Sequence, residues 1–234
     1  ASGCGAYNIT GDYVLDNRAY SPHIAEGIDA EATNEFQCLS GIAAGGEDLI
    51  EPNTAIIHGI GLKVADIEEV AVNNAKLVWS PRSNISLYGA TAPVTTYHNY
   101  GVTVALGTDW TPSGSSTVLR ELQCADYLDT NHYGDRFSDR EQWLMVTRNA
   151  AIALGANDQI GSLRPGMVAD IAVFDASVNS LHRAVIDADL PDVQLVLRGS
   201  KVLTGTSSLV EDLTDANTFA ACEAASDCVS DHVV

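Results

Sequence analysis

The alternation of short apolar runs with longer helix-period segments is the feature that most constrains this fold. Between residues 50 and 175, runs rich in β-branched residues are followed by segments with the 3.6-residue period of a helix. The clearest pairs are a strand at 54–58 with a helix at 63–75, and a strand at 76–80, closed by a proline, with a helix at 93–100. Such alternation is typical of strand-helix units in a parallel sheet, so the sequence predicts an α/β fold.

Further units extend this pattern in both directions along the chain. The run after residue 101 is apolar or β-branched on both faces, which predicts a fully buried strand. Ser138 and Glu141 have the spacing of a capping box at the start of a helix. The remaining expected elements are strands at 17–24 and 102–107, and helices at 29–39, 117–129 and 138–155.

The pattern changes in the last third of the chain. Strand-like runs at 170–174, 193–197 and 201–203 follow one another across short turns. Short strands joined in this way predict a small antiparallel or mixed β element. We therefore expect two parts, an α/β part over 1–163 and a β part with a tail over 164–234.

Charge and hydropathy exclude several classes of protein. The chain of 234 residues has 12 Lys and Arg against 31 Asp and Glu, a formal net charge of −19. A field of this sign repels phosphate backbones, so we expect no nucleic-acid partner. No run of about 18 apolar residues occurs, so we expect no membrane helix. The length falls slightly short of the roughly 250 residues of a complete eightfold α/β barrel.

The five cysteines are irregularly spaced and include no C-x-x-C pair, which argues against a structural zinc site. Cys222 and Cys228 lie six residues apart in a small polar segment, where they form either a short disulfide loop or two free thiols. The pair and the acidic balance slightly favour an exported protein over a cytoplasmic one.

Three groups that can bind a metal or transfer a proton follow predicted strands: His23, His58 and Asp109. Because the carboxyl ends of parallel strands share one edge of a sheet, we expect them to meet there. Each residue alone is more often a core histidine or a helix cap. Together, imidazole and carboxylate are the ligands that Zn²⁺ selects.

Glu26 lies three residues after His23, at the start of a helical segment. It is either a first-turn carboxylate favoured by the helix dipole or a proton shuttle beside a metal-activated water. His132, in a polar loop at 130–135, is a candidate for substrate contact, and the other histidines are expected to be structural or solvated. The sequence contains no G-x-S-x-G and no Walker-type loop, so serine-hydrolase and nucleotide-binding functions lack support.

At these residues the chain resembles the amidohydrolase superfamily of metal-dependent hydrolases. The resemblance is closest to its mononuclear branch of cytosine, guanine and adenosine-type deaminases and triazine hydrolases. It covers roughly residues 17–205 and implies a barrel joined to a small β-sandwich. The matching segments are PHIAEG (22–27), IIHG (56–59), SPRSN (80–84), GVTVALGTD (101–109), MVTRNAAIALG (145–155) and IGSLRPGMVADIAVFD (160–175).

The resemblance implies a role for each residue at the strand ends. It makes His23 the metal ligand of the fifth barrel strand and Glu26 the proton shuttle. It makes His58 the sixth-strand histidine that polarises or protonates the substrate. Asp109 becomes the eighth-strand ligand, which also deprotonates the hydrolytic water. The implied cofactor is one divalent transition metal, zinc first, with iron or manganese as alternatives.

Ser83 and Asn84 match a family motif near the seventh strand that shapes the site and contacts substrate. Glu26, three residues after the histidine, marks the mononuclear branch rather than the binuclear branch with a carboxylated lysine. Lys63 does not stand in the place of that lysine.

The chain departs from the family at its start. No two histidines are separated by one residue, so the family's first-strand H-x-H pair of metal ligands is absent from this sequence. We therefore expect the C-terminal half of a (β/α)8 barrel, strands five to eight, plus part of the sandwich. The other half would be a cleaved fragment, a separate chain or an upstream segment.

The expected function is a metal-dependent hydrolase that cleaves C–N bonds of a small-molecule substrate, by deamination or cleavage of an amide-like bond. Its expected partners are the N-terminal half with the H-x-H ligands and further copies in a homo-oligomer. The alternative is a non-catalytic scaffold or binding subunit, motivated by the missing H-x-H pair.

Overall fold

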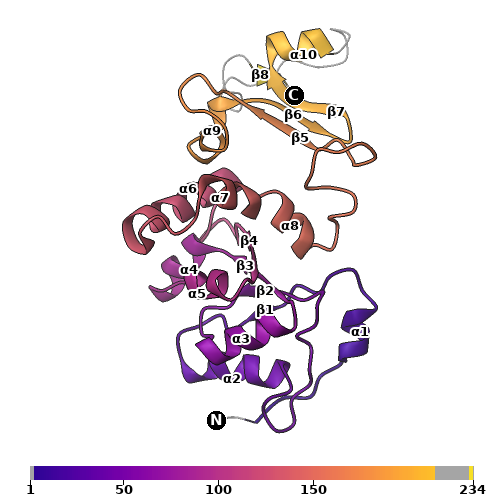
Figure 1. The fold of residues 1–234 in the computed structure, drawn as a ribbon, viewed down its shortest axis with the longest axis vertical. Helices are drawn as coiled ribbons and strands as arrows, with labels where there is room; N and C mark the ends of the chain where they lie inside the picture. The colour runs from indigo at the N-terminus through magenta and orange to yellow at the C-terminus, as the bar shows by residue number, and fades with distance from the viewer. Residues whose placement is uncertain (1–2, 214–231, 234) are drawn as a thin grey trace. The chain divides into compact units, whose positions relative to one another are not determined.

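A computed structural model describes residues 3–213 and 232–233. Contacts divide the chain into two compact units, Ala1–Gly161 and Ser162–Val234. In the first unit, four parallel strands form one sheet in the order β1-β2-β3-β4 (Figure 1). They span His23–Ile24, Ala55–His58, Lys76–Trp79 and Thr103–Leu106. The unit is therefore of the predicted α/β class, with its strands in chain order.

Helices connect and follow these strands. The short α1 precedes the sheet, α2 joins β1 to β2, and α3 joins β2 to β3. Two helices, α4 and α5, join β3 to β4, and the remaining helices follow β4. The bounds are α1 Gly11–Leu15, α2 Ala30–Leu39, α3 Val64–Val72, α4 Pro81–Tyr88, α5 Val94–Asn99, α6 Val118–Leu128, the π-helix η1 Asp129–Tyr133, α7 Asp139–Met145 and α8 Arg148–Ala153.

Side-chain caps place the helix starts where the sequence predicts them. Asp29 accepts the backbone N–H of Ala32 at the start of α2. Ser138 and Glu141 form the predicted capping box at the start of α7. The sheet itself is apolar on both faces, with Ile24, Ile56, Leu77 and Ala105 buried. Strands buried on both faces are what a parallel sheet covered by helices requires.

Four local expectations are corrected. The expected strand at 17–24 is only His23–Ile24 plus an isolated parallel bridge from Tyr20 to Thr54, because Pro22 has no N–H for a ladder. Pro81 closes β3 but also opens α4, because proline fits the first turn of a helix. The expected helix 138–155 is two helices, interrupted at Thr147, whose φ and ψ are −123° and −96°. The expected loop around His132 is η1.

The second unit is a four-stranded antiparallel sheet in the order β5-β6-β7-β8, of the antiparallel type that the sequence allows. Its strands are Ile171–Phe174, Val193–Arg198, Lys201–Thr206 and His232–Val233, accompanied by α9 (Arg183–Ile186), the 3₁₀ helix η2 (Leu190–Asp192) and α10 (Ser207–Leu213). A turn at Gly199 and Ser200, both with positive φ, joins β6 to β7.

A disulfide joins Cys4 to Cys38 on α2. No sequence pattern predicts this pair, because its members lie 34 residues apart with no recognisable spacing. Cys222 and Cys228, the expected pair, lie outside the described residues. Among the helices of the described part, none has the length and apolarity to cross a membrane.

Candidate functional site

Three side chains that follow different strands meet at the carboxyl edge of the parallel sheet. Glu26 follows β1, His58 ends β2 and Asp109 follows β4. His58 Nε2 lies 3.5 Å from Glu26 Oε2 and 3.9 Å from Asp109 Oδ2. One ligand atom from each of the three lies within 4.8 Å of the others. This carboxylate-histidine cluster is the candidate functional site.

The backbone at this edge is held in an uncommon conformation. Ala25, His58 and Asp109 have φ values of 54°, 75° and 53°, in the left-handed region that residues with a Cβ seldom adopt. Each lies at or just beyond the end of its strand, where the chain turns away from the sheet. Such conformations cost about 1–3 kcal/mol each and cluster at functional sites, where surrounding contacts hold them in place.

Hydrogen bonds fix the tautomer of His58. The indole N–H of Trp79 donates to Thr91 Oγ1 at 2.7 Å, and the amide nitrogen of Asn84 donates to the same oxygen at 3.2 Å. The amide oxygen of Asn84 therefore faces His58 Nδ1, at 2.9 Å. Because an amide oxygen only accepts, Nδ1 carries the proton in this contact.

The other ring nitrogen of His58, Nε2, is buried without a hydrogen-bond partner among the described residues. The His58 side chain is 1% exposed. Its Nε2 faces two carboxylates, which also only accept when ionised. An imidazole nitrogen between two carboxylate oxygens suits a positive group at this point, either a proton on Nε2 or a divalent cation. The donor set therefore fits a metal such as zinc.

Asp109 is oriented through both of its oxygens. Its Oδ1 accepts the backbone N–H of Trp110 at 2.8 Å, and its Oδ2 accepts the hydroxyl of Ser83. Since the O–H of Ser83 is already used in the hydrogen bond to Asp109, the hydroxyl of Ser113 donates to Ser83 Oγ, at 2.8 Å. Ser83 and Asn84 are both fully buried on α4. These two neighbours thus hold Asp109 and His58 respectively.

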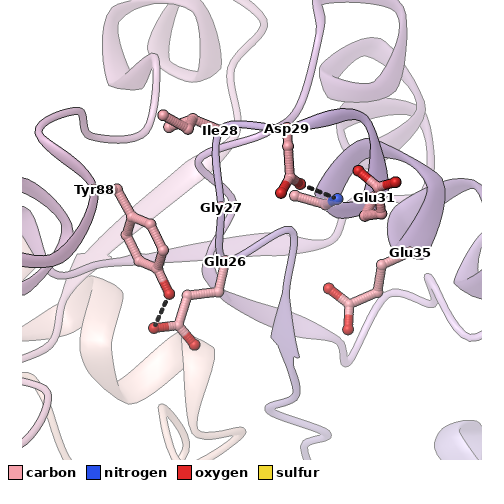
Figure 2. Close-up of a pocket in the computed structure, with 8 residues that line it drawn as sticks. Glu26, Gly27, Ile28, Asp29, Glu31, Glu35 and Tyr88 are labelled. Carbon is pink, nitrogen blue, oxygen red and sulfur yellow. Dashed lines mark hydrogen bonds between the residues drawn. The ribbon is translucent and has the colours of Figure 1, made fainter.

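Glu26 borders a hollow of about 380 Å³ beside the cluster (Figure 2). The hydroxyl of Tyr88, from the end of α4, donates to Glu26 Oε1 at 3.2 Å. Burial, and then the Glu26 charge, raise the pKa of Tyr88, so this donor keeps its proton. Tyr88 was not recognised from the sequence because α4 itself was not predicted. The lining is Glu26, Gly27, Ile28, Asp29, Glu31, Ala32, Glu35 and Tyr88.

The carboxylates of this hollow also support its walls. Asp29 caps α2, and Glu35 Oε2 accepts the backbone N–H of Ala25 at 2.8 Å, across the turn that carries Glu26. This bond helps to hold Ala25 in its left-handed conformation. Figure 2 shows these acidic side chains around Glu26, with the Tyr88 hydroxyl pointing at it.

Two predicted site residues lie outside the cluster. The His23 ring is 5.1 Å from the His58 ring but is exposed, and its nitrogens are not among the clustered ligand atoms. His132 is exposed on η1 with its ring against Tyr127, and no hydrogen bond between described residues connects it with Glu26, His58 or Asp109. The structure thus brings together Glu26, His58, Ser83, Asn84 and Asp109, with His23 alongside.

Comparisons with known proteins show the family of this chain. The sequence model of the Amidohydrolase family matches residues 21–208, and the chain belongs to this family. A protein named 5-methylthioadenosine/S-adenosylhomocysteine deaminase from Teredinibacter turnerae is 33% identical over 174 residues, 71% of this chain and 39% of that protein. A 5'-deoxyadenosine deaminase from Methanothermobacter thermautotrophicus is 26% identical over a region that covers 72% of this chain and 43% of that protein.

Solved structures show the same fold. An adenosine deaminase from Xanthomonas campestris with bound zinc matches 79% of this chain and 45% of its own, with a TM-score of 0.67 and 22% identity. Atrazine chlorohydrolase from Arthrobacter aurescens, complexed with zinc, matches 86% of this chain and 49% of its own, with a TM-score of 0.67 and 24% identity. The chain therefore spans about two fifths to one half of the length of these relatives.

Proposed function

We propose that this chain provides the acid-base half of a metal-dependent deaminase active site, for an amino-substituted heterocycle of the adenosine type. The observation that carries the proposal is the unpartnered Nε2 of His58 between Glu26 and Asp109. The names of the relatives, which include several adenosine-type deaminases, support the substrate class.

The residues that would hold the metal are Asp109 and His23, with the remaining ligands from an N-terminal half. Zinc is the first candidate, because the related structures contain it and because imidazole with carboxylate suits it. Iron and manganese remain alternatives on the same donor set. When bound, the ion would supply Lewis-acid activation of water near neutral pH.

The chain's own residues would carry the proton transfers. Asp109, oriented by Ser83, accepts a proton from the hydrolytic water. The oxygen of that water adds to the substrate carbon that bears the amino group. Glu26 relays the proton from Asp109 to the departing nitrogen, which leaves as ammonia, so that both carboxylates return to their starting state. His58 faces the substrate with Nε2. The amide oxygen of Asn84 accepts a hydrogen bond from His58 Nδ1 and keeps that nitrogen protonated. Ser83 and Asn84 shape the floor of the site, and His132 is the outermost candidate for substrate contact.

The proposed partner is the N-terminal half of a (β/α)8 barrel that carries the H-x-H ligands. In the described part of the first unit, the sheet has four strands, and β1 and β4 are its edges. The chain matches less than half of the length of these relatives, which supports the proposal that this sheet is the second half of a closed barrel. Closure would also cover two edges that otherwise invite aggregation. Further copies of the assembled barrel form the proposed homo-oligomer.

The Cys4–Cys38 disulfide supports an exported setting, since disulfides persist in oxidising compartments.

Release of ammonia tests this function. The chain, together with an N-terminal half from a related deaminase gene, is reconstituted with zinc and supplied with adenosine-type nucleosides. We expect ammonia release that a chelator abolishes and zinc restores. A complex that assembles and takes up no metal would instead support the non-catalytic scaffold, for which the missing H-x-H pair is the motivating observation.

The same preparation distinguishes two ligand sets. If His23 and Asp109 hold the ion, His23→Ala loses zinc, while His58→Asn keeps zinc and loses turnover. If the close cluster of Glu26, His58 and Asp109 holds it, His58→Asn loses zinc as well.

A further inference from the structure

A buried carboxylate outside the cluster connects the two segments that orient the cluster. Glu121 lies on α6, and its side chain is fully buried. Its Oε1 accepts the backbone N–H of Arg82 at 2.9 Å, and its Oε2 accepts the hydroxyl of Ser115. Arg82 is the second residue of α4, and Ser115 lies in the loop after Asp109. One side chain therefore joins a helix and a loop through two residues, Arg82 and Ser115, that lie 33 positions apart in sequence.

The start of α4 depends on the hydrogen bond from Arg82 N–H to Glu121, because the N-cap residue of α4 makes no side-chain capping bond. Ser80 is the N-cap residue, but its side chain makes no capping bond, and its hydroxyl is buried without a hydrogen-bond partner among the described residues. Pro81 has no N–H to satisfy, so Arg82 presents a free N–H early in the helix. Glu121 accepts that N–H from a neighbouring helix and places a carboxylate at the positive end of α4.

The loop after Asp109 depends on the other oxygen. Ser115 is 4% exposed, and its backbone N–H donates to the carbonyl of Thr108 at 3.1 Å, which closes the loop. Gly114 lies so close to Thr108 that a Cβ there would be 1.9 Å from the Thr108 oxygen. The loop is therefore compact, and the hydrogen bond from the Ser115 hydroxyl to Glu121 connects it to α6.

The helix contacts the cluster directly, and the loop contacts it through Ser83. On α4, Ser83 donates to Asp109 and Asn84 accepts from His58. In the loop, Ser113 donates to Ser83. A shift of either segment would therefore change the orientation of Asp109 and the tautomer of His58 together.

We propose that Glu121 is a positioning residue, whose two hydrogen bonds set the orientation of Asp109 and the tautomer of His58 from outside the site. The importance of Glu121 for turnover rests on the proposed function. Its effect on the His58 ring, on the start of α4 and on the loop after Asp109 does not.

The test compares Glu121→Ala with Asp129→Ala in the full chain. Asp129 is a matched control: it is a buried carboxylate directly after α6, and it accepts the backbone N–H groups of Arg136 and Phe137 at 2.8 and 3.0 Å. Two readouts are independent of metal and activity. Amide hydrogen exchange reports the two segments, and ¹⁵N NMR of the imidazole nitrogens reports the His58 tautomer.

We expect Glu121→Ala to speed exchange at residues 82–84 and 108–115 by about tenfold or more, as the loss of a buried acceptor implies. It should also reduce the population of His58 with a protonated Nδ1. Asp129→Ala should speed exchange at 136–137 and leave the His58 signals unchanged. Glu121→Gln should restore both, because its amide oxygen can accept from Arg82 and its amide nitrogen can donate to Ser115 Oγ.

If Glu121→Ala does not fold, Ser115→Ala removes only the loop contact, and we expect faster exchange at 108–115 than at 82–84. The proposal is overturned if the alanine variants leave these segments and the His58 signals no more altered than Asp129→Ala does. In the reconstituted enzyme, a fall in kcat with little change in KM should accompany the altered tautomer. An inactive wild type with the predicted NMR response would count against the proposed function alone.

Discussion

At the scale of single residues, His58 has the surroundings that matter most for the site. Thr91 Oγ1 accepts from the Trp79 indole and from the Asn84 amide nitrogen, which leaves the Asn84 amide oxygen to accept from His58 Nδ1. The histidine and its position after a strand can be read from the sequence. Its tautomer cannot, because Thr91 and Asn84 approach it only once α4 has formed. The sequence thus predicts which residues follow the strands, and the fold determines how their polar atoms face one another.

Replacing Asn84 by Ala should leave the buried N–H of His58 without an acceptor. We expect a loss of about 1–3 kcal/mol in the free energy of unfolding, the cost of an unsatisfied buried donor. We also expect Nε2 to become protonated in part of the population, which ¹⁵N NMR of the ring would detect. As a control, Asn131→Ala removes an exposed side chain that bonds only to a nearby carbonyl, and it should change neither quantity. An unchanged His58 spectrum in Asn84→Ala would refute the tautomer assignment.

Glu141 gives a pH-dependent prediction at the same scale. Hydrogen bonds from the hydroxyl and backbone N–H of Ser138, and a weaker contribution from His98, lower its pKa from 4.5 to about 2. A carboxylate with a lowered pKa in the folded state stabilises the protein above its unfolded pKa, and this stabilisation is lost as pH falls toward about 2.

Glu141→Gln should therefore lower stability at pH 7, by less than about 1 kcal/mol because the pair is partly exposed. The difference between wild type and variant should shrink as pH falls from about 5 to about 2. Thermal unfolding at several pH values measures this difference. A difference that is the same at pH 7 and pH 3 would show that the charge of Glu141 does not contribute.

At the scale of elements, the strands were predictable and the helix that builds the site was not. Apolar runs at 54–58, 76–80 and 102–107 match β2, β3 and β4 closely, because a strand buried on both faces leaves a continuous apolar signal. Pro81 was interpreted as the end of a strand, although it also begins α4. Since α4 carries Ser83, Asn84 and Tyr88, the geometry of the site had no sequence signal beyond the family motif.

The Cys4–Cys38 disulfide ties a segment outside the regular elements to α2. It closes a loop of 34 residues, for which the chain-entropy account gives a stabilisation of about 3–4 kcal/mol. We expect Cys4→Ser to lower the unfolding free energy by up to this amount, and reductant to have the same effect on wild type but none on the variant. Urea unfolding with and without reductant measures both. Equal stability of wild type in the two conditions would contradict the structural role of this bond.

At the scale of the whole molecule, the first unit carries the residues of the proposed site. The first unit supplies Glu26, His58 and Asp109 on one edge of a parallel sheet, and the sequence lacks the H-x-H pair. Matches to between 39% and 49% of the length of several relatives agree with a division of the ligands between two halves. The proposed activity therefore belongs to the assembled protein, with this chain as the acid-base side of its site.

The most direct test of the account combines zinc content and ammonia release in the reconstituted protein, for wild type, Asp109→Ala and Asp135→Ala. Asp135 is a matched control, because it also has a φ of 53° but is exposed and lies outside the cluster. The account predicts about one zinc per site in wild type and in Asp135→Ala. In Asp109→Ala it predicts loss of zinc and a fall in turnover of about 10³-fold or more. Near-normal zinc content and turnover in Asp109→Ala would contradict it.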